Sequence, residues 1–522
     1  MKKLFLVLAA AAIASGAYAE GYQVNNMSAK QTGMGHVGTA MKLNSESIFF
    51  NPAATAFQTS KFDISAGMTG ILSNVSYRSL PTLENGYQSG AAEKSDNKLS
   101  TPIHVYFNYK PTERLAVGLG FYTPYGSSMN WGDNWSGAHL VQEINLTAFT
   151  FQPTVSYKIC DRLSVGAGLT VSWGNFDLSR SLLSPTMRRG LISGTIDPNI
   201  TQLQGAINSG MLTGDALAQA TATLQTLEGA KGYLNSTMNR SLVSAKLQGD
   251  SDVAVGVNAG FLWDITDEWS VGMTWRSRLN MKVGKGHATM NIDPQAAALI
   301  AKLGELKPDT ELIPGLDKGT FNAELPLPTT VTWAVSFRPA VKWELAVDLQ
   351  WTGWSAYKAL NVAFNEKELG IKPIYSVKNY SNTLAFRFGA QYRATDFITA
   401  RMGMYVDESP VSSDYLNPET PSMTKVSYTA APHQVHVDRP GLLLRFVGRP
   451  RTHRLLSPLR LYRRQPRRGI FGQLHAPRQR ILDRRRVQFL KTEKIAIFAV
   501  RSATDAPHRF NSSIVQGIER GV

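Results

Sequence analysis

The chain has 522 residues, one cysteine and a formal net charge of +16, a composition that first suggests an anionic partner such as nucleic acid. The charge is uneven: residues 1–430 hold 22 Lys and 13 Arg against 34 acidic residues, whereas residues 431–522 hold 18 Arg and 2 Lys against 5. The excess therefore marks a change of composition near residue 431 and is no property of the whole protein. The single Cys160 excludes an intrachain disulfide.

The first twenty residues are typical of a cleaved export signal. Lys2 and Lys3 form a charged start, Leu4–Ala14 an apolar stretch, and Ala17-Tyr18-Ala19 an A-x-A cleavage site. The apolar stretch would rise only about 16 Å as a helix, about half of a bilayer core. After residue 19 no apolar run is long enough for a helical membrane span. We therefore expect residues 1–19 to be a signal peptide and the mature protein to be exported.

Residues 20–60 are rich in Gly, Ala, Ser and Asn. The segment is too polar for a set of strands, too rich in glycine for a stable helix and too apolar for a disordered tail. This composition suits a compact plug.

From residue 61 onward the sequence alternates between apolar and polar residues. In Leu163–Gly174 the odd positions are all apolar and the even ones small or polar, and Trp343–Trp351 repeats the pattern. Period two over this length is typical of a strand that crosses a membrane at a tilt. Glu344 and Asp348 lie on the polar face, which cannot contact lipid and must line a polar lumen. The pattern predicts an all-β, transmembrane antiparallel barrel.

Eleven strands are readable, and their connections alternate in length. We expect strands at about 61–71, 101–110, 114–122, 146–159, 162–174, 252–264, 268–279, 329–338, 342–354, 382–393 and 397–406. Short turns of two or three residues alternate with long loops at about 72–100, 123–145, 175–251, 280–328, 355–381 and 407–424. Short periplasmic turns and long extracellular loops are the pattern of outer-membrane barrels. A twelfth strand begins at Lys425, so the barrel, residues 61–430, is predicted to be incomplete.

Two of the long loops are predicted to contain helices. Asp215 is a plausible N-cap for Ala216–Glu228, and Asp293 with Pro294 opens Gln295–Lys302. Each helix carries apolar residues on its surface: Leu217, Leu224 and Leu227 in the first, and Leu299, Ile300 and Leu303 in the second. Either the two helices pack on each other as a cap, or they frame a groove for an apolar ligand.

Basic residues are the candidates for binding an acidic head group. Alternation places five arginines toward the lumen and one lysine lies on a loop: Arg276, Arg338, Arg387, Arg393, Arg401 and Lys358. The alternative is that the arginines form structural ion pairs with Glu344 or Asp348.

The sequence contains no motif that is typical of an enzyme active site. His36, His104, His139 and His287 are scattered, and no Ser/His pair, metal-ligand spacing or phosphate-binding loop is present in the sequence. We expect no enzyme activity, no metal and no cofactor.

Six stretches in order along residues 20–430 resemble the FadL family of outer-membrane transporters for long-chain fatty acids and other hydrophobic compounds. They are SIFFNPAATA, TPYGSSMNWGDNWSGAHLVQEINLTAFTFQPTVSY, WSVGMTWRS, LPTTVTWAVSFRP, WELAVDLQWTGWSAYK and MGMYVDESPV. The resemblance implies a fourteen-stranded barrel with an N-terminal hatch in its lumen. It also implies passive uptake in which the ligand leaves sideways through the wall.

The resemblance assigns roles to particular residues. Asn51, Pro52 and Ala53 would belong to the hatch. The third strand, with Gly118 and Gly120 before Pro124, is where we expect the wall to open, because Gly and Pro weaken ladder pairing. The chain departs from the family pattern at two positions: where the resemblance implies basic head-group contacts, it has Asn175 and Asn361. Those two residues weaken the case for a fatty acid and favour a neutral hydrophobic ligand.

We therefore expect an outer-membrane protein that takes up fatty acids, with aromatic hydrocarbons as the second choice. Its partners would be the hydrophobic ligand, outer-membrane lipid and lipopolysaccharide, without nucleic acid, and the protein would be monomeric. The competing hypothesis is a structural or adhesive barrel that transports nothing.

Residues 431–522 allow three interpretations. The first is an arm that binds nucleic acid or lipopolysaccharide, the second is a periplasmic extension, and the third is the product of a shifted coding frame. A shifted frame of a GC-rich gene gives excess Arg and Pro, few Lys and no period, as in HRLLSPLRLYRRQPRRG. We favour the frameshift, because an extension would leave the barrel short of strands and with open edges in lipid.

Overall fold

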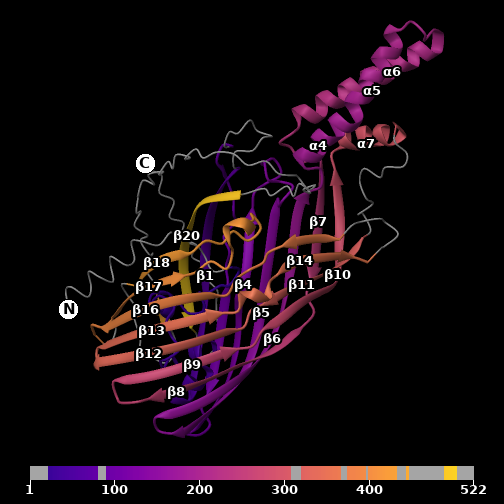
Figure 1. The fold of residues 1–522 in the computed structure, drawn as a ribbon. Helices are drawn as coiled ribbons and strands as arrows, with labels where there is room; N and C mark the ends of the chain where they lie inside the picture. Colours follow the sequence, from indigo (N-terminus) through magenta and orange to yellow (C-terminus); the bar gives the residue numbers. More distant parts are fainter. Residues whose placement is uncertain are drawn as a thin grey trace, which may run out of the picture.

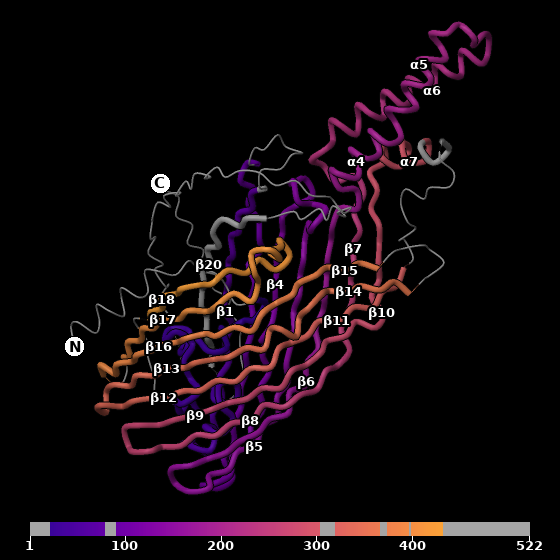
Figure 2. Tube along the Cα trace, viewed as in Figure 1, coloured from indigo at the N-terminus to yellow at the C-terminus, as the bar shows by residue number. Residues whose placement is uncertain are grey.

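The computed structural model describes residues 21–79, 90–306, 319–365, 373–395 and 398–431, and the backbone of two further strands, 443–445 and 487–502 (Figures 1 and 2). The predicted signal peptide, residues 1–19, lies outside the described residues, as does most of the arginine-rich tail.

The wall is an antiparallel sheet whose lower strands follow one another in chain order. The strands are β1 (Phe62–Ser79), β2 (Glu93–Lys94), β3 (Ile103–Tyr109), β4 (Leu115–Asn130), β5 (Glu143–Cys160), β6 (Leu163–Ser181), β7 (Val243–Asp250), β8 (Ala254–Asp264), β9 (Trp269–Arg276), β10 (Leu279–Ile292), β11 (Thr320–Leu327), β12 (Thr330–Ala340), β13 (Trp343–Thr352), β14 (Ala359–Phe364), β15 (Ile374–Val377), β16 (Thr383–Arg393), β17 (Thr399–Asp407), β18 (Lys425–Ala431), β19 (Leu443–Arg445) and β20 (Val487–Ser502). Pairing runs β1–β3–β4–β5–β6–β8–β9–β12–β13–β16–β17–β18. The predicted antiparallel β-barrel is confirmed.

The sheet has a second, upper tier near the long loops. There the pairing is β6–β7–β10–β11–β14–β15, so β6 pairs with β8 below and with β7 above. Five strands of the lower tier are each continued upward after a short break, as β8 is by β7 and β9 by β10 (Figure 1). The upper tier was predicted as loop, because only the lower one keeps a strict alternation.

Exposure of the side chains is inverted relative to a water-soluble protein. On β6, Val165 and Leu169 are 41% and 46% exposed, whereas Ser164 and Ser172 are fully buried. Other strands repeat this arrangement, with apolar residues outward and small or polar residues inward. An outward apolar surface over a polar interior is what lipid requires.

Each predicted strand overlaps an observed one, but β1, β4 and β6 continue into the segments 72–100, 123–145 and 175–251 that were predicted as loops. β18 confirms a strand beginning at Lys425. The tail strand β20 pairs with β1, and β19 pairs with β20. Among the strands that the structure describes, none pairs with the second edge of β18.

Helices occur in the N-terminal segment and in the upper loops. They are α2 (Ala29–Thr32), η1 (Asn44–Glu46), α3 (Ser47–Phe50), η2 (Pro52–Phe57), α4 (Pro185–Leu191), η4 (Ile192–Ile196), α5 (Asp197–Asn208), α6 (Gly214–Ser236), α7 (Pro294–Leu306), η6 (Trp354–Ala356) and η8 (Ser413–Tyr415). The hairpin of α5 and α6 projects beyond the rim (Figure 1). In the described part of the chain, no helix is both long and apolar enough to cross a membrane.

Candidate functional site

Residues 21–58, here called the plug segment, lie inside the barrel with their backbone against glycines of the wall. A methyl group on Gly403 would lie 2.2 Å from the backbone N of Gly35 and 2.2 Å from the backbone C of Met34. A methyl group on Gly389 would lie 2.3 Å from the Met34 carbonyl oxygen. Gly35 itself has a φ of 67°, which favours glycine. The wall therefore needs glycine where the plug segment passes.

The tripeptide Asn51-Pro52-Ala53 fixes the plug segment to β6 and β8. The Asn51 Nδ2 donates hydrogen bonds to the carbonyl oxygens of Thr39 at 2.8 Å and of Phe261 at 2.9 Å. Its Oδ1 accepts from the Ala53 N–H at 3.1 Å and caps η2. A methyl group on Gly166 of β6 would lie 2.6 Å from the Ala53 nitrogen. These contacts use both hydrogen-bond donors of the amide and one lone pair of its oxygen.

A buried carboxylate on β13 holds the middle of the plug segment. Oδ2 of Asp348, which is 1% exposed, accepts hydrogen bonds from the backbone N–H groups of Gly38 and Thr39, each at 3.1 Å. Bonds from two amides compensate part of the cost of burying this charge.

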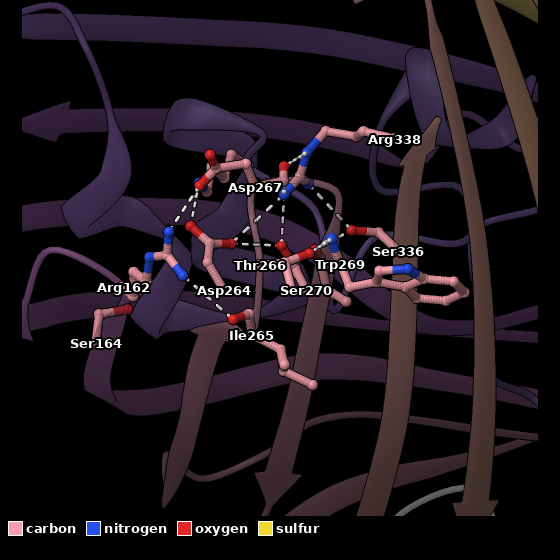
Figure 3. A network of polar contacts seen from close by, with 12 residues as sticks. Arg162, Ser164, Asp264, Ile265, Thr266, Asp267, Trp269, Ser270, Ser336 and Arg338 are labelled. Carbon is pink, nitrogen blue, oxygen red and sulfur yellow. Dashed lines mark hydrogen bonds and ion pairs between the residues drawn. The ribbon is translucent and has the colours of Figure 1, made fainter. Parts of the chain in front are cut away.

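A polar network that includes Asp264, Ser270 and Arg338 lies near the short turns of the wall (Figure 3), and Lys42 of the plug segment contacts it. Lys42 Nζ lies 2.5 Å from Asp264 Oδ2 at the end of β8. Arg338 lies 3.6 Å from Asp264 Oδ1 and 3.7 Å from Glu344 Oε1, and it donates a 2.7 Å hydrogen bond to the Ser270 hydroxyl. Arg338 therefore forms structural ion pairs, including one with Glu344, which was the alternative to its predicted role in binding a head group.

A small pocket lies higher in the lumen, beside β4. Its walls include Tyr122, Pro124, Thr170 and Arg276. The Arg276 guanidinium donates to the Phe49 carbonyl oxygen at 3.1 Å, and it stands 5.8 Å from the centre of the Tyr122 ring. Two predicted site residues, Arg276 and Pro124, are thus brought together.

The wall is interrupted where this pocket meets β4. Pairing of β4 with β3 ends at His104 and Tyr122, although β4 continues to Asn130. On its other side the register with β5 shifts between Tyr122 and Tyr125. A bulge and the loss of a neighbouring strand therefore coincide at Thr123 and Pro124, which weakens the ladder there.

The start of the plug segment takes the place of the missing strand. The Val24 N–H donates to the Pro124 carbonyl oxygen at 2.8 Å, and the Gly126 N–H donates to the Tyr22 carbonyl oxygen at 2.9 Å. The upper edge of β4 is thus covered by the first residues of the plug segment, which take the place of a neighbouring strand.

A larger pocket of about 590 Å³ lies above the small one. Apolar side chains from the upper tier and β5 form most of its wall, among them Leu146, Met281, Val283 and Leu360. Glu419, from the loop between β17 and β18, is at its edge. A mostly apolar wall with a few polar groups is typical of sites that bind small hydrophobic molecules.

The two pockets are stacked along the lumen and separated by an aromatic residue of the plug segment. On β10, Leu279 lines the small pocket and Met281 the larger one. Tyr22 lines the larger pocket and Tyr125 the small one, with their ring centres 6.1 Å apart. Movement of the first plug residues would connect the pockets and uncover the edge of β4 at the same time.

The sequence profile of the family described as "Outer membrane protein transport protein (OMPP1/FadL/TodX)" matches residues 10–430. The chain belongs to this family. It is an outer-membrane protein, and the sequence resemblance to the FadL family is confirmed.

Relatives in this family are distant in sequence but span most of the chain. The "Long-chain fatty acid transport protein" of Escherichia coli O6:H1 is 22% identical over 438 residues, covering 82% of this chain and 86% of that protein. The "47 kDa outer membrane protein" of Pasteurella multocida is 25% identical over 409 residues, covering 77% and 81%.

Solved structures support the same fold. A FadL homologue of Pseudomonas aeruginosa superposes with a TM-score of 0.61 at 17% identity, covering 92% of this chain and 98% of that one. The toluene transporter TbuX of Ralstonia pickettii gives a TM-score of 0.54 at 15% identity, with 92% and 100% covered. At these identities the likeness shows the barrel and no substrate.

Not all the basic residues predicted for this FadL-family chain face a pocket. Arg387 donates to Gln350 Oε1 at 2.8 Å and lies 3.6 Å from Asp407 Oδ1, so it belongs to a buried polar cluster of the wall. Arg401 donates to Gln391, and the predicted loop residue Lys358 is exposed, as is Arg393. Only Arg276 lines either of the two pockets described above.

The two asparagines at the positions where the resemblance led us to expect basic contacts are both exposed. Asn175 is among the residues that line the larger pocket, whereas Asn361 lines neither pocket and alternates with the lumenal Leu360. The expectation of a neutral ligand that was drawn from these two residues stays a prediction.

The predicted gate glycines lie below the interruption of the wall. Gly118 and Gly120 are paired regularly with β3 and β5. Methyl groups on them would lie 2.7 and 2.9 Å from side-chain atoms of Ile48 in the plug segment. They make room for the plug segment, whereas the break itself is at Pro124.

The helices of the upper loops pack on each other. Leu227 is fully buried in an apolar cluster with Leu234 of α6 and Ile196, and Leu299 and Ile300 of α7 pack against the same cluster. Of the other predicted contact residues, Leu224 is half-buried, Leu217 is 37% exposed, and the side chain of Leu303 is outside the described residues. This arrangement favours the cap over an open groove.

Asp293 joins α7 to α6, and through it the cap should respond to acid. Its carboxylate accepts hydrogen bonds from the Gln295 and Ala296 N–H groups at 3.0 and 3.2 Å and from the Tyr233 hydroxyl at 2.8 Å. The Tyr233 hydrogen bond is the main reason that the pKa of Asp293 lies below its usual 3.8. A lowered pKa stabilises the folded state above the unfolded pKa, and this stability is lost as the pH falls through the folded value.

We therefore expect amides 294–300 to keep their hydrogen-exchange protection between about pH 7 and pH 5, and to lose part of it below about pH 4. Exchange rates measured by mass spectrometry, corrected for the intrinsic effect of pH, would check this. Asp293→Ala should already show the lower protection at neutral pH. Equal protection in both proteins at all pH values would contradict the assignment.

The larger pocket was missed by sequence reasoning. Its apolar residues on β10 lie on the lumenal face, where the lower strands carry polar groups. A signal was present, because Leu279, Met281 and Val283 alternate with Asn280 and Lys282 in a segment predicted as loop.

Proposed function

We propose that this chain takes up hydrophobic small molecules across the outer membrane by passive diffusion, through the larger pocket, the small pocket and then sideways through the wall at Pro124. The observation that carries the proposal is the stacking of two pockets that end at an interruption of β4. Membership in a family of outer-membrane transport proteins supports it.

Such transport requires no energy source. Burial of each methylene of a ligand gains about 0.8 kcal/mol, so successive apolar sites suffice if the last one opens into lipid. The plug segment, with Lys42 held to Asp264, blocks a direct path toward the short turns. Release into the membrane through the wall avoids that obstruction.

The plug segment acts in this proposal as the hatch. Its first residues cover β4 through two backbone hydrogen bonds, while Asn51, Pro52 and Ala53 fix its far part to the wall. The start can therefore move while the rest stays in place. Residues 20–60 would be the hatch domain and residues 61–430 the barrel.

Long-chain fatty acids and aromatic hydrocarbons are the proposed substrates, because a relative is named for the first and a structure of the same fold for the second. We propose that the chain moves these compounds without altering them chemically.

The test is binding and uptake with two probes, radiolabelled oleate and toluene. Purified protein should bind at least one of them saturably, and cells that lack their own transporter should accumulate it when they express the chain. Heat-modifiable migration on a gel serves as the folding check. A folded protein that binds neither probe would favour a structural barrel and defeat the proposal.

We propose in addition that residues 431–522 derive from a shifted reading frame, because the family match ends at residue 430, where the composition changes. Translation of the same nucleotides in the other two frames should give alternating strands. If neither frame does, the residues belong to the protein.

A further inference from the structure

The larger pocket has one buried charged side chain at its surface. Of the two acidic residues along its wall, Glu324 is exposed and alternates with the lumenal Ala323 and Leu325, so its carboxylate points outward. Glu419 is 7% exposed and reaches the pocket from the loop between β17 and β18. Of the ionisable carboxylates along the wall, Glu419 is therefore the one that is buried against the pocket.

Glu419 is held in place from several sides. The fully buried Lys378 donates a hydrogen bond to its Oε2. The neighbouring backbone is fixed by the Trp131 indole, which donates to the Pro418 carbonyl oxygen at 3.0 Å, and by a 2.8 Å hydrogen bond between the hydroxyls of Tyr380 and Thr420. A carboxylate positioned in this way does not have to be ordered when a ligand binds, which favours recognition.

The second oxygen of this carboxylate is available. Within the described residues no group donates a hydrogen bond to Glu419 Oε1, whereas Oε2 is occupied by Lys378. An ionised carboxylate only accepts hydrogen bonds. The complementary head group is therefore a donor.

Two cations stand near Glu419 but not at the pocket surface. Lys378 forms its ion pair, and Arg180 of β6 interacts with it electrostatically, yet neither lines the pocket. With both nearby, the region carries no excess negative charge that would attract a cationic ligand. An anionic ligand would meet the Glu419 carboxylate first, and Lys378 and Arg180 behind it would offset only part of the repulsion between the two like charges.

We propose that Glu419 is the specificity-determining residue of the larger pocket and selects hydrophobic ligands with a neutral hydrogen-bond donor, such as phenols and alcohols, over carboxylates. This inference rests on the proposed uptake of hydrophobic small molecules, and within that class it shifts the preferred substrates from fatty acids to neutral compounds that carry a hydrogen-bond donor. Lys378 acts as a positioning residue, since it neutralises Glu419 and directs one oxygen toward the ligand.

The test compares three probes that differ in one group: 4-butylphenol, butylbenzene and 4-butylbenzoate, titrated calorimetrically at about pH 7.5 into the full chain in detergent. At this pH the phenol is neutral and the benzoate ionised. We expect the phenol to bind about tenfold more tightly than butylbenzene, because a hydrogen bond to a charged group contributes more than an ordinary one. The benzoate should bind about tenfold more weakly than the phenol.

Glu419→Gln supplies the second comparison. It removes the charge and leaves Lys378 without its partner, so the affinity for the phenol should fall toward that of butylbenzene while the affinity for the benzoate rises about tenfold. Glu324→Gln is the matched control, because it makes the same change on the outward side of the same wall, and it should alter neither affinity. The ranking of the three probes on the unaltered protein stands as a test even if Glu419→Gln fails to fold.

The outcomes separate the two proposals. If butylbenzene binds as tightly as the phenol, or the benzoate binds most tightly of the three, the role of Glu419 is refuted while transport of hydrophobic compounds stands. If the ratio of the affinities for the phenol and the benzoate is unchanged in folded Glu419→Gln, the role of Glu419 is refuted as well. If the folded protein binds none of the three probes, the proposed function fails, and this inference fails with it.

Discussion

Gly403→Ala is expected to open the barrel to water-soluble molecules. The added methyl group would lie 2.2 Å from backbone atoms of Met34 and Gly35, and neither β17 nor the plug backbone can yield as a flexible side chain does. Overpacking of this kind costs about 1–3 kcal/mol, and the plug segment can relieve it by leaving the wall. Cells that express the variant should become sensitive to vancomycin, which intact outer membranes exclude.

Gly205→Ala is the matched control, since a methyl group on this glycine of α5 meets nothing within 4 Å. It should leave both vancomycin resistance and the thermal stability of the barrel unchanged. If Gly403→Ala is as impermeable as the wild type and equally stable, the plug segment does not rest on β17 as described.

A disulfide between Gln23→Cys and Tyr125→Cys is expected to stop uptake. These residues face each other in an antiparallel bridge between the plug segment and the upper edge of β4. If the ligand leaves at Pro124, fixing this bridge keeps the exit covered. With Cys160→Ser as the background, oxidised protein should take up labelled oleate or toluene at least about tenfold more slowly, and dithiothreitol should restore the rate.

A disulfide between Phe62→Cys and Tyr109→Cys provides the comparison, because this pair faces across the regular ladder of β1 and β3. It should form without any effect on uptake. Normal uptake by the fully oxidised Gln23–Tyr125 variant would place the exit elsewhere.

The lower tier of the sheet could be predicted from the sequence because lipid imposes a strict rule on it. One face of each strand must be apolar, so the alternation in Leu163–Gly174 and Trp343–Trp351 reports both the strand and its orientation. The twelfth strand followed from the same rule at Lys425. The short turns were located correctly because the alternation resumes within a few residues.

The upper tier escaped prediction because its outer face is no longer in lipid. On β10, Lys282 and Lys285 interrupt what would be an apolar face, and the segment looks like a loop. Helices α4 and α5 were also missed, although the sequence carries a signal. Ser184 caps α4 by accepting from the Met187 N–H at 3.2 Å, with a proline as the next residue.

The candidate site could be predicted only in part. Arg276 and Pro124 were identified separately, and nothing in the sequence showed that they share a pocket. Glu419 could not be identified, since its role depends on Lys378, which is 41 residues away and in a different loop. Such a pair is fixed by the closure of the sheet and not by local pattern.

The two-tier sheet implies that selectivity and closure are mechanically separate parts of this molecule. The upper tier and its loops supply most of the larger pocket, whereas the plug segment is anchored to the lower tier through β6, β8, β13 and β17. Because five strands are interrupted between the tiers, their upper parts can be exchanged while β5 and β6, which run through both tiers, keep the register of the sheet. The pocket-forming upper strands are thus a module, and grafting them onto a related barrel should transfer ligand preference while the recipient keeps its own hatch.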